Sequence, residues 1–230
     1  MTGAIMSRRR TPEFSQYCFD FLPAYLMRST IDRDWRDNLY FGLKPPTGKA
    51  EIIANSSDLL SNMLEPGYKQ TIPQCLHVSL VSCNKHACPP ESLIAQIHDR
   101  MNGFKGSSID IVFDRLGAFG RNSIVLYKGG TDYAFDALRR SILVRTMVLP
   151  DIRRANRNSA SPHMTIFHGK LLGSARRVET LAWRAQEVLL IYSHNGASWH
   201  TVVGRWPLTA NKFEADATRS SAKHDWDLFY

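Results

Sequence analysis

Apolar residues recur at every second position along several short segments of the chain. Leu76, Val78 and Leu80 are separated by single residues, and the same period of two is found over 109–113. Because successive side chains of a strand point to opposite faces, this period is typical of a strand with one buried face. Together with short apolar runs bounded by turn residues, it predicts strands over 39–43, 76–81, 109–113, 123–127, 162–167, 188–192 and 199–203, the last two joined by a turn at Asn195-Gly196.

Other segments repeat apolar residues at the spacing of a helix. Asp132 is suited to cap a helix whose inner face holds Phe135, Leu138 and Ile142. Pro89-Pro90 opens a second helix, which continues to about residue 104. Two more helices are predicted, one with Ile52, Leu59, Leu60 and Met63 on its inner face and a short one that begins at Ser174 and includes Val178 and Leu181.

The predicted elements follow one another in the order strand, helix, strand, helix, strand over 38–115, and this order recurs in the second half of the chain. Two related halves, each of mixed strands and helices, are therefore expected. We expect one domain over 38–210, an N-terminal extension over 1–37 and a C-terminal tail over 211–230. The total of 230 residues is within the range of a single domain.

Composition narrows the class of protein and of partner. Hydrophobic residues make up 43% of the chain, as in ordinary globular proteins, and 29 Lys and Arg against 21 Asp and Glu favour an anionic partner without naming it. No apolar run approaches the ~20 residues that a membrane-spanning helix needs. Four cysteines without a Cys-x-x-Cys pair do not form a disulfide scaffold. We expect a monomeric protein of the reducing cytoplasm that does not associate with membranes.

Two predicted strands, one in each half, carry a histidine followed two positions later by a hydroxyl residue. They are His77-Val78-Ser79 and His163-Met164-Thr165. Strand alternation places His77 and Ser79 on one face, and His163 and Thr165 on one face of the other strand. If the two halves pack about a pseudo-two-fold axis, two imidazoles and two hydroxyls meet across a cleft.

This set of side chains suits displacement at phosphorus. One imidazole takes a proton from the attacking oxygen and the other delivers a proton to the oxygen that leaves. Ser79 and Thr165 would donate hydrogen bonds to the non-bridging phosphate oxygens. The scheme requires neither a metal ion nor a cofactor. The alternative for each histidine alone is a structural residue whose ring is satisfied by nearby backbone.

At these residues the chain resembles the two-histidine (2H) phosphoesterase superfamily, in particular its branch of 2'-5' RNA ligases and cyclic phosphodiesterases. The resemblance covers about 38–208 and is carried by Leu39–Pro46, Leu76–Leu80 and Ser161–Ile166. It implies an α+β, bilobal fold, in which two pseudo-symmetric lobes of antiparallel sheet with flanking helices surround a central cleft. Ser79 stands where Thr is commoner, and His168 and Gly169 stand where the ligase branch often has Arg.

The resemblance also implies an activity. It is metal-independent hydrolysis of a 2',3'-cyclic phosphate to a 2'-phosphate, or the reversible joining of RNA ends by 2'-5' phosphodiester bonds. His163 would activate the water and His77 would protonate the departing ribose oxygen, with the roles exchanged in the reverse reaction. The partner would be RNA or a nucleotide. The alternative from another class is a protein that keeps the bilobal fold and binds RNA ends without chemistry.

Two further features bear on RNA binding. Arg153, Arg154 and Arg157 directly precede the second motif, so they either line the cleft and contact the RNA backbone or belong to a solvated basic loop. Tyr40 is a candidate platform for stacking a base, as are Phe119, Tyr127 and Trp206, and the alternative for each is packing in the core or at its rim.

Overall fold

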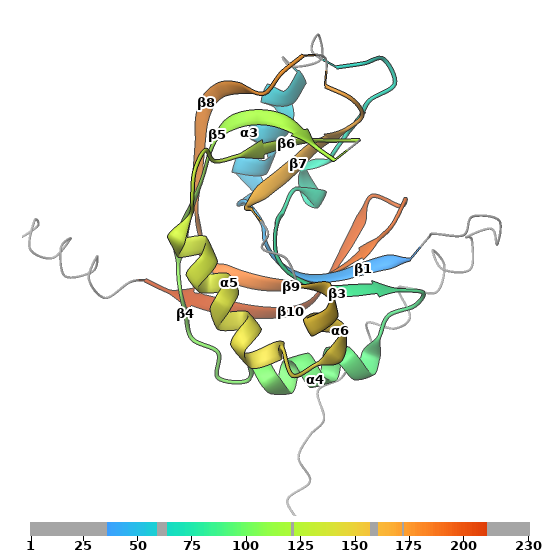
Figure 1. Cartoon of the computed structure of the whole chain (residues 1–230), viewed down its shortest axis with the longest axis vertical. Coiled ribbons are helices and arrows are strands. Elements are labelled where there is room, and N and C mark those ends of the chain that lie inside the picture. Colours follow the sequence, from blue (N-terminus) through green and yellow to red (C-terminus); the bar gives the residue numbers. More distant parts are fainter. Residues whose placement is uncertain (1–35, 59–63, 121, 157–160, 172, 211–230) are drawn as a thin grey trace, which may run out of the picture. The chain divides into compact units, whose positions relative to one another are not determined.

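Two five-stranded sheets make up the framework of the protein (Figure 1). The computed structural model describes residues 36–58, 64–120, 122–156, 161–171 and 173–210. The expected extension 1–37 and tail 211–230 lie outside these residues, apart from Arg36 and Asp37. Both sheets belong to the compact unit that begins at Arg36.

The first sheet has the strand order β3-β1-β9-β10-β4 and carries the first motif. Its pairings are antiparallel except that of β10 with the short β4. Its strands are β1 (Asp37–Leu43), β3 (Val78–His86), β4 (Gly106–Ser107), β9 (Glu187–His194) and β10 (Trp199–Thr209). Long apolar runs form its centre, since Val188 to Tyr192 are all nearly inaccessible to solvent.

The second sheet has the strand order β2-β7-β6-β5-β8, is antiparallel throughout and carries the second motif. Its strands are β2 (Lys69–Gln70), β5 (Ile109–Phe119), β6 (Ser123–Tyr127), β7 (His163–His168) and β8 (Arg176–Ala185). Ile109, Ile111 and Phe113 of β5 are buried, as their alternation predicts.

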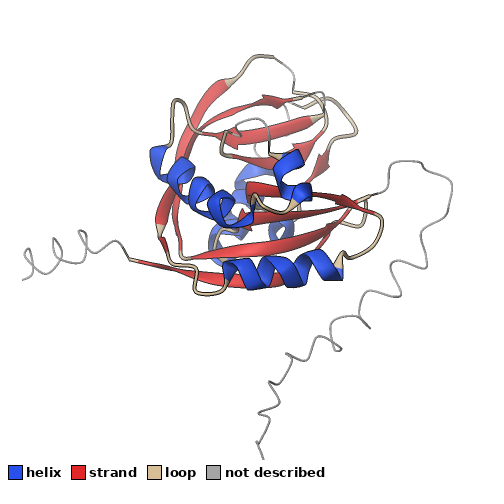
Figure 2. Cartoon of the chain, turned by 60° about the horizontal axis from the view of Figure 1, so that its bottom comes forward, coloured by secondary structure: helices blue, strands red, loops and turns tan. Residues whose placement is uncertain are grey.

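Helices cover one face of the first sheet. In Figures 1 and 2, α4, α5 and α6 lie on the side of this sheet that faces away from the second one. The helices are α3 (Thr47–Asp58), α4 (Glu91–Met101), α5 (Tyr133–Thr146) and α6 (Pro150–Ala155), together with the one-turn 3-10 helix η2 (Pro73–Cys75). Asp132 caps α5 as predicted, because its Oδ1 accepts a hydrogen bond from the Phe135 amide at 3.0 Å. No described helix is long and apolar enough to cross a membrane.

The expected α+β fold is confirmed, but each lobe draws on both halves of the chain. β9 and β10 from the second half complete the first sheet, and β5 from the first half lies in the second sheet. The prediction that the halves repeat one order of elements is wrong at its last helix. Element order alone does not say which strands pair, because pairing depends on contacts between distant segments.

Two predicted details are corrected by the structure. The segment from Ser174 is the strand β8 and not a helix, and Trp183 and Ala185 are its buried residues. The spacing of Val178 and Leu181 fits a helix, but β8 pairs with β5 alone and half of its side chains are exposed, so the period of two is weak. Ile52 is 53% exposed, whereas Ile53 is buried, and Leu59, Leu60 and Met63 lie outside the described residues.

Candidate active site

The two motif histidines make the same hydrogen bond with the backbone. Nδ1 of His77 is 2.8 Å from the carbonyl oxygen of Cys75, and Nδ1 of His163 is 2.8 Å from that of Ser161, two residues earlier in each case. A carbonyl oxygen only accepts hydrogen bonds, so Nδ1 carries the proton in both rings. Nε2 is therefore the nitrogen that is free to exchange a proton with a ligand.

A β-bulge follows the hydroxyl residue in both motif strands. Phe41 pairs with Val81 and Gly42 with Ser79, so Leu80 is the extra residue in β3. In β7, Ile166 is the extra residue, because Ile124 pairs with Phe167 and Val125 with Thr165. The bulge lies three positions after the histidine in each strand. The two motifs therefore share backbone geometry as well as residue types.

Each bulge returns the residue five positions after the histidine to the face of the motif. Leu80 and Val81 are both buried, as are Ile166 and Phe167, so Ser82 and His168 rejoin the faces of Ser79 and Thr165. Simple alternation places His168 opposite His163, and that placement is wrong. His168 lines the same cavity as Thr165.

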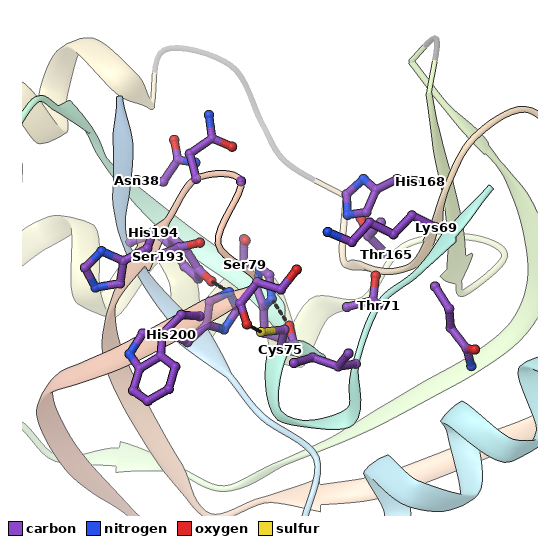
Figure 3. Close-up of a pocket in the computed structure, with 18 of the residues that line it drawn as sticks. Asn38, Lys69, Thr71, Cys75, Ser79, Thr165, His168, Ser193, His194 and His200 are labelled. Atoms are coloured by element: carbon purple, nitrogen blue, oxygen red, sulfur yellow. Dashed lines mark hydrogen bonds between the residues drawn. The ribbon is translucent and has the colours of Figure 1, made fainter. Parts of the chain in front are cut away.

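A cavity of about 540 Å³ lies between the two motifs. His77 and Ser79 line it from one sheet and Thr165 from the other, as Figure 3 shows for the two hydroxyl residues. His163 is not among the lining residues and lies two positions before Thr165, at the first residue of β7. Its charge nevertheless lowers the pKa of His77, which places the two rings within electrostatic reach of each other.

His77 is enclosed by aromatic rings from two other strands. Tyr40 of β1 stacks on it with a centroid distance of 4.8 Å, and His200 of β10 meets it edge-on at 5.0 Å. Burial, and then the charges of Lys44, His163 and His168, lower the pKa of His77 to about 4, although its bond to the Cys75 carbonyl raises it. His77 is therefore neutral at pH 7, with Nε2 able to accept a proton.

His200 is also held neutral. Burial, followed by the charges of His77, Lys44 and His194, lowers its pKa to about 3. Its Nε2 lies 3.4 Å from the Tyr40 hydroxyl, and its buried Nδ1 has no hydrogen-bond partner among the described residues. The first-motif side of the cavity thus presents uncharged rings at neutral pH.

The second-motif side is more open. His163 stacks on Phe119, which is 51% exposed, with a centroid distance of 4.4 Å. Lys69 of β2 pairs with His168 and lines the cavity together with Thr71, as Figure 3 shows. Burial and the charge of Lys69 lower the pKa of His168. Lys69 is the cation at this side. It is the only Lys or Arg among the described residues that line the cavity.

Of the candidate RNA contacts, Tyr40 lines the cavity and the described arginines lie elsewhere. Arg153 and Arg154 are exposed residues of α6, and neither lines the cavity; Arg157 lies outside the described residues. Tyr40 is 7% exposed and packs on His77, so it offers little ring surface to a base. Trp206 is buried against Phe41. Whether Arg153 and Arg154 contact RNA beyond the cavity stays a prediction.

Sequence reasoning misses the contribution of β10 to the site. His200 follows the final hairpin turn by a few residues and has no motif of its own, yet the pairing of β10 with β9, and of β9 with β1, brings it to His77.

Cys75 also lines the cavity, and its thiol donates to the Ser198 carbonyl at 3.2 Å. No group of three or more His, Cys, Asp or Glu residues suited to a metal ion occurs within the described ranges.

Comparison with known proteins finds relatives by structure alone. No protein-family model matches the chain, and no curated protein matches its sequence. TT0787 of Thermus thermophilus matches with a TM-score of 0.59 and 16% identity over 76% of this chain and 99% of that one. E. coli LigT complexed with 3'-AMP matches at 0.58 and 15% identity over 76% and 99%. A phosphoesterase matches at 0.56 and 15% identity over 75% and 99%. The chain thus has the fold of these proteins, the one that its resemblance to the 2H phosphoesterases implies.

Proposed function

We propose that the protein is a phosphoesterase that cleaves a 2',3'-cyclic phosphate to a 2'-phosphate, or forms and breaks 2'-5' phosphodiester bonds, on RNA ends or nucleotides. The observation that carries the proposal is the matched geometry of the two motifs. Each fixes a histidine through Nδ1 so that Nε2 is free, and each adds a hydroxyl that lines one cavity. His77, Ser79 and Thr165 at one cavity, with His163 two positions before Thr165, provide two proton-transfer groups and two hydrogen-bond donors that suit in-line displacement at phosphorus.

In the hydrolytic direction His77 is assigned the base. Its neutral Nε2 takes a proton from water as the water oxygen bonds to phosphorus. His163, as an imidazolium with both ring nitrogens protonated, donates its Nε2 proton to the ribose 3' oxygen as the bond between that oxygen and phosphorus breaks. This reverses the roles that the resemblance implies, because burial lowers the pKa of His77 and leaves its Nε2 unprotonated at neutral pH. In ligation a 5'-hydroxyl takes the place of water.

Ser79 and Thr165 are assigned to the non-bridging oxygens of the phosphate. They come from different sheets and line the same cavity, so they can donate to one phosphoryl group from two sides. Donors aimed at oxygens that gain charge lower the barrier, and removal of one such donor costs about 10²–10³-fold in rate where it has been measured. Lys69 at the same cavity supplies a positive charge for the anionic substrate.

The test incubates the full-length, chelator-treated protein with 2',3'-cyclic mononucleotides and with oligonucleotides that end in a cyclic phosphate. We expect a 2'-phosphate product with a free 3'-hydroxyl, at a rate that the chelator does not change. His77→Ala and His163→Ala should each abolish turnover while the far-ultraviolet circular dichroism stays that of the wild type. Full activity of either variant would overturn the assignment. Nucleotide binding without product at high protein concentration would instead support a non-catalytic RNA-end-binding protein.

A further inference from the structure

The cavity extends well beyond the two motifs, in two directions. Figure 3 shows Lys69, Thr71, Thr165 and His168 on one side and Asn38, Ser193, His194 and His200 on the other, with Ser79 and Cys75 between them. We call the second group, the lining residues of 193–200 with Asn38, the hairpin arm, because most of it comes from the β9–β10 hairpin. A volume of about 540 Å³ lies within the range of sites for whole small molecules.

The hairpin arm differs from the opposite side in charge. None of the described residues that form it is Lys, Arg, Asp or Glu, whereas Lys69 stands on the other side. His194 is paired with the buried Asp37, its Nδ1 lying 3.3 Å from Oδ2. His200 is neutral at pH 7 because burial lowers its pKa. A polar arm without Lys, Arg, Asp or Glu among its described residues, whose His194 is already paired with Asp37, suits a heterocycle with hydrogen-bonding edges better than a second phosphate.

Trp199 supplies an aromatic surface to this arm. It lines the cavity and is nevertheless 64% exposed, so part of its ring is open to solvent at the cavity's edge. Its Nε1 donates to the Thr201 hydroxyl at 3.2 Å, which orients the indole. An exposed indole beside a site for a phosphate is suited to stack on a nucleobase.

The arm is held in place by contacts at both ends of the hairpin turn. Oδ1 of Asp37 accepts from the Asn195 amide at 2.9 Å, and the Cys75 thiol donates to the Ser198 carbonyl at 3.2 Å. Cys75 also provides the carbonyl that fixes His77. The turn is thereby tied to the residue that positions the base. A preformed arm costs less ordering when a ligand binds.

We propose that the hairpin arm is a nucleobase subsite in which Trp199 stacks on the base of the nucleotide whose phosphate lies between the motifs. The inference rests on the proposed function for the location of the phosphate. It adds a specific recognition of the nucleoside, so the substrate class includes a base and is not a bare sugar phosphate. Asn38 and Ser193 are placed to meet polar groups of the base or ribose.

The test compares binding of adenosine 3'-monophosphate and of inorganic phosphate to the full-length protein by isothermal titration calorimetry. Trp199→Ala should weaken nucleotide binding by roughly 10-fold or more and leave phosphate binding unchanged, because only the nucleotide carries a base. Trp199→Phe should retain most of the nucleotide affinity. Tyr133→Ala, which removes an 81%-exposed aromatic side chain that does not line the cavity, serves as the matched control and should change neither.

The outcomes separate this inference from the proposed function. Unchanged nucleotide affinity in Trp199→Ala, an equal loss for nucleotide and phosphate, or no binding of the nucleotide by the wild type would overturn the subsite. Turnover of cyclic nucleotides with the same KM in wild type and Trp199→Ala would leave the proposed function standing without the subsite. Base-dependent binding through Trp199 without any turnover would leave the subsite standing without the proposed chemistry.

Discussion

The two motifs share backbone geometry and differ in their surroundings. Both histidines donate Nδ1–H to the carbonyl two residues earlier, and both strands have a bulge at the same offset. His77, however, is enclosed by Tyr40 and His200, whereas His163 stacks on the half-exposed Phe119. The shared geometry exposes the same nitrogen in each ring.

The difference in surroundings gives the two sides of the cavity different chemical character. Enclosure lowers the pKa of His77 and keeps its ring neutral, which is the state a base needs. The second side holds Lys69, which suits an anionic phosphate. Under the proposed mechanism, the neutral His77 is the base and His163, on the more open side, is the acid.

The largest expected effect is on the pH dependence of kcat/KM, which reports the free enzyme. Because His77 must be neutral to accept a proton, the rate of the wild type should fall on the acid side only near pH 4, the pKa of His77. His77→Asn and His163→Asn should each lower kcat by at least ~10²-fold. The fall in rate near pH 4 should persist in His163→Asn and should be absent in His77→Asn. If the fall in rate near pH 4 persisted in His77→Asn, the roles of base and acid would have to be exchanged between His77 and His163.

The sequence predicts the two motif strands because one face of each is apolar and the other polar. Val78 and Met164 are buried, and the motif residues beside them are on the opposite face, as alternation requires. It does not predict the face of His168, because the bulge at Ile166 breaks the alternation. His200 is missed for a different reason. Its contact with His77 depends on strand pairing across 123 positions of sequence, and a local pattern carries no record of such pairing.

Truncation of Tyr40, which stacks on His77, should lower the free energy of unfolding more than truncation of Phe119, which stacks on His163. Tyr40 is 7% exposed and packs with Leu189 and Ile191, so Tyr40→Ala should lower the free energy of unfolding by about 3–5 kcal/mol. Phe119 is 51% exposed, and Phe119→Ala should cost about 1 kcal/mol or less. Tyr40→Phe, which keeps the ring, should cost at most about 1 kcal/mol. Urea unfolding measures all three, and equal losses for the two alanine variants would contradict the described burial.

The smallest expected effect is the change in a histidine pKa when a nearby lysine charge is removed, with Lys44 acting on His77 and Lys69 on His168. The charge of Lys44 lowers the pKa of His77, after burial, and the charge of Lys69 lowers that of His168. Lys44→Met should therefore raise the pKa of His77, and Lys69→Met should raise that of His168, each while leaving the other histidine nearly unchanged. The shifts should be modest, because burial, the larger cause in both cases, remains.

These pKa changes are measured from the NMR shifts of the imidazole Cε1 protons as a function of pH, with no need for turnover. Lys128→Met is the matched control, since Lys128 pairs with Asp132 at 3.6 Å and does not line the cavity, and it should move neither pKa. If Lys44→Met raised both pKa values equally, the two sides would share one electrostatic environment. The proposed assignment of His77 as base and His163 as acid would then need a cause other than unequal surroundings.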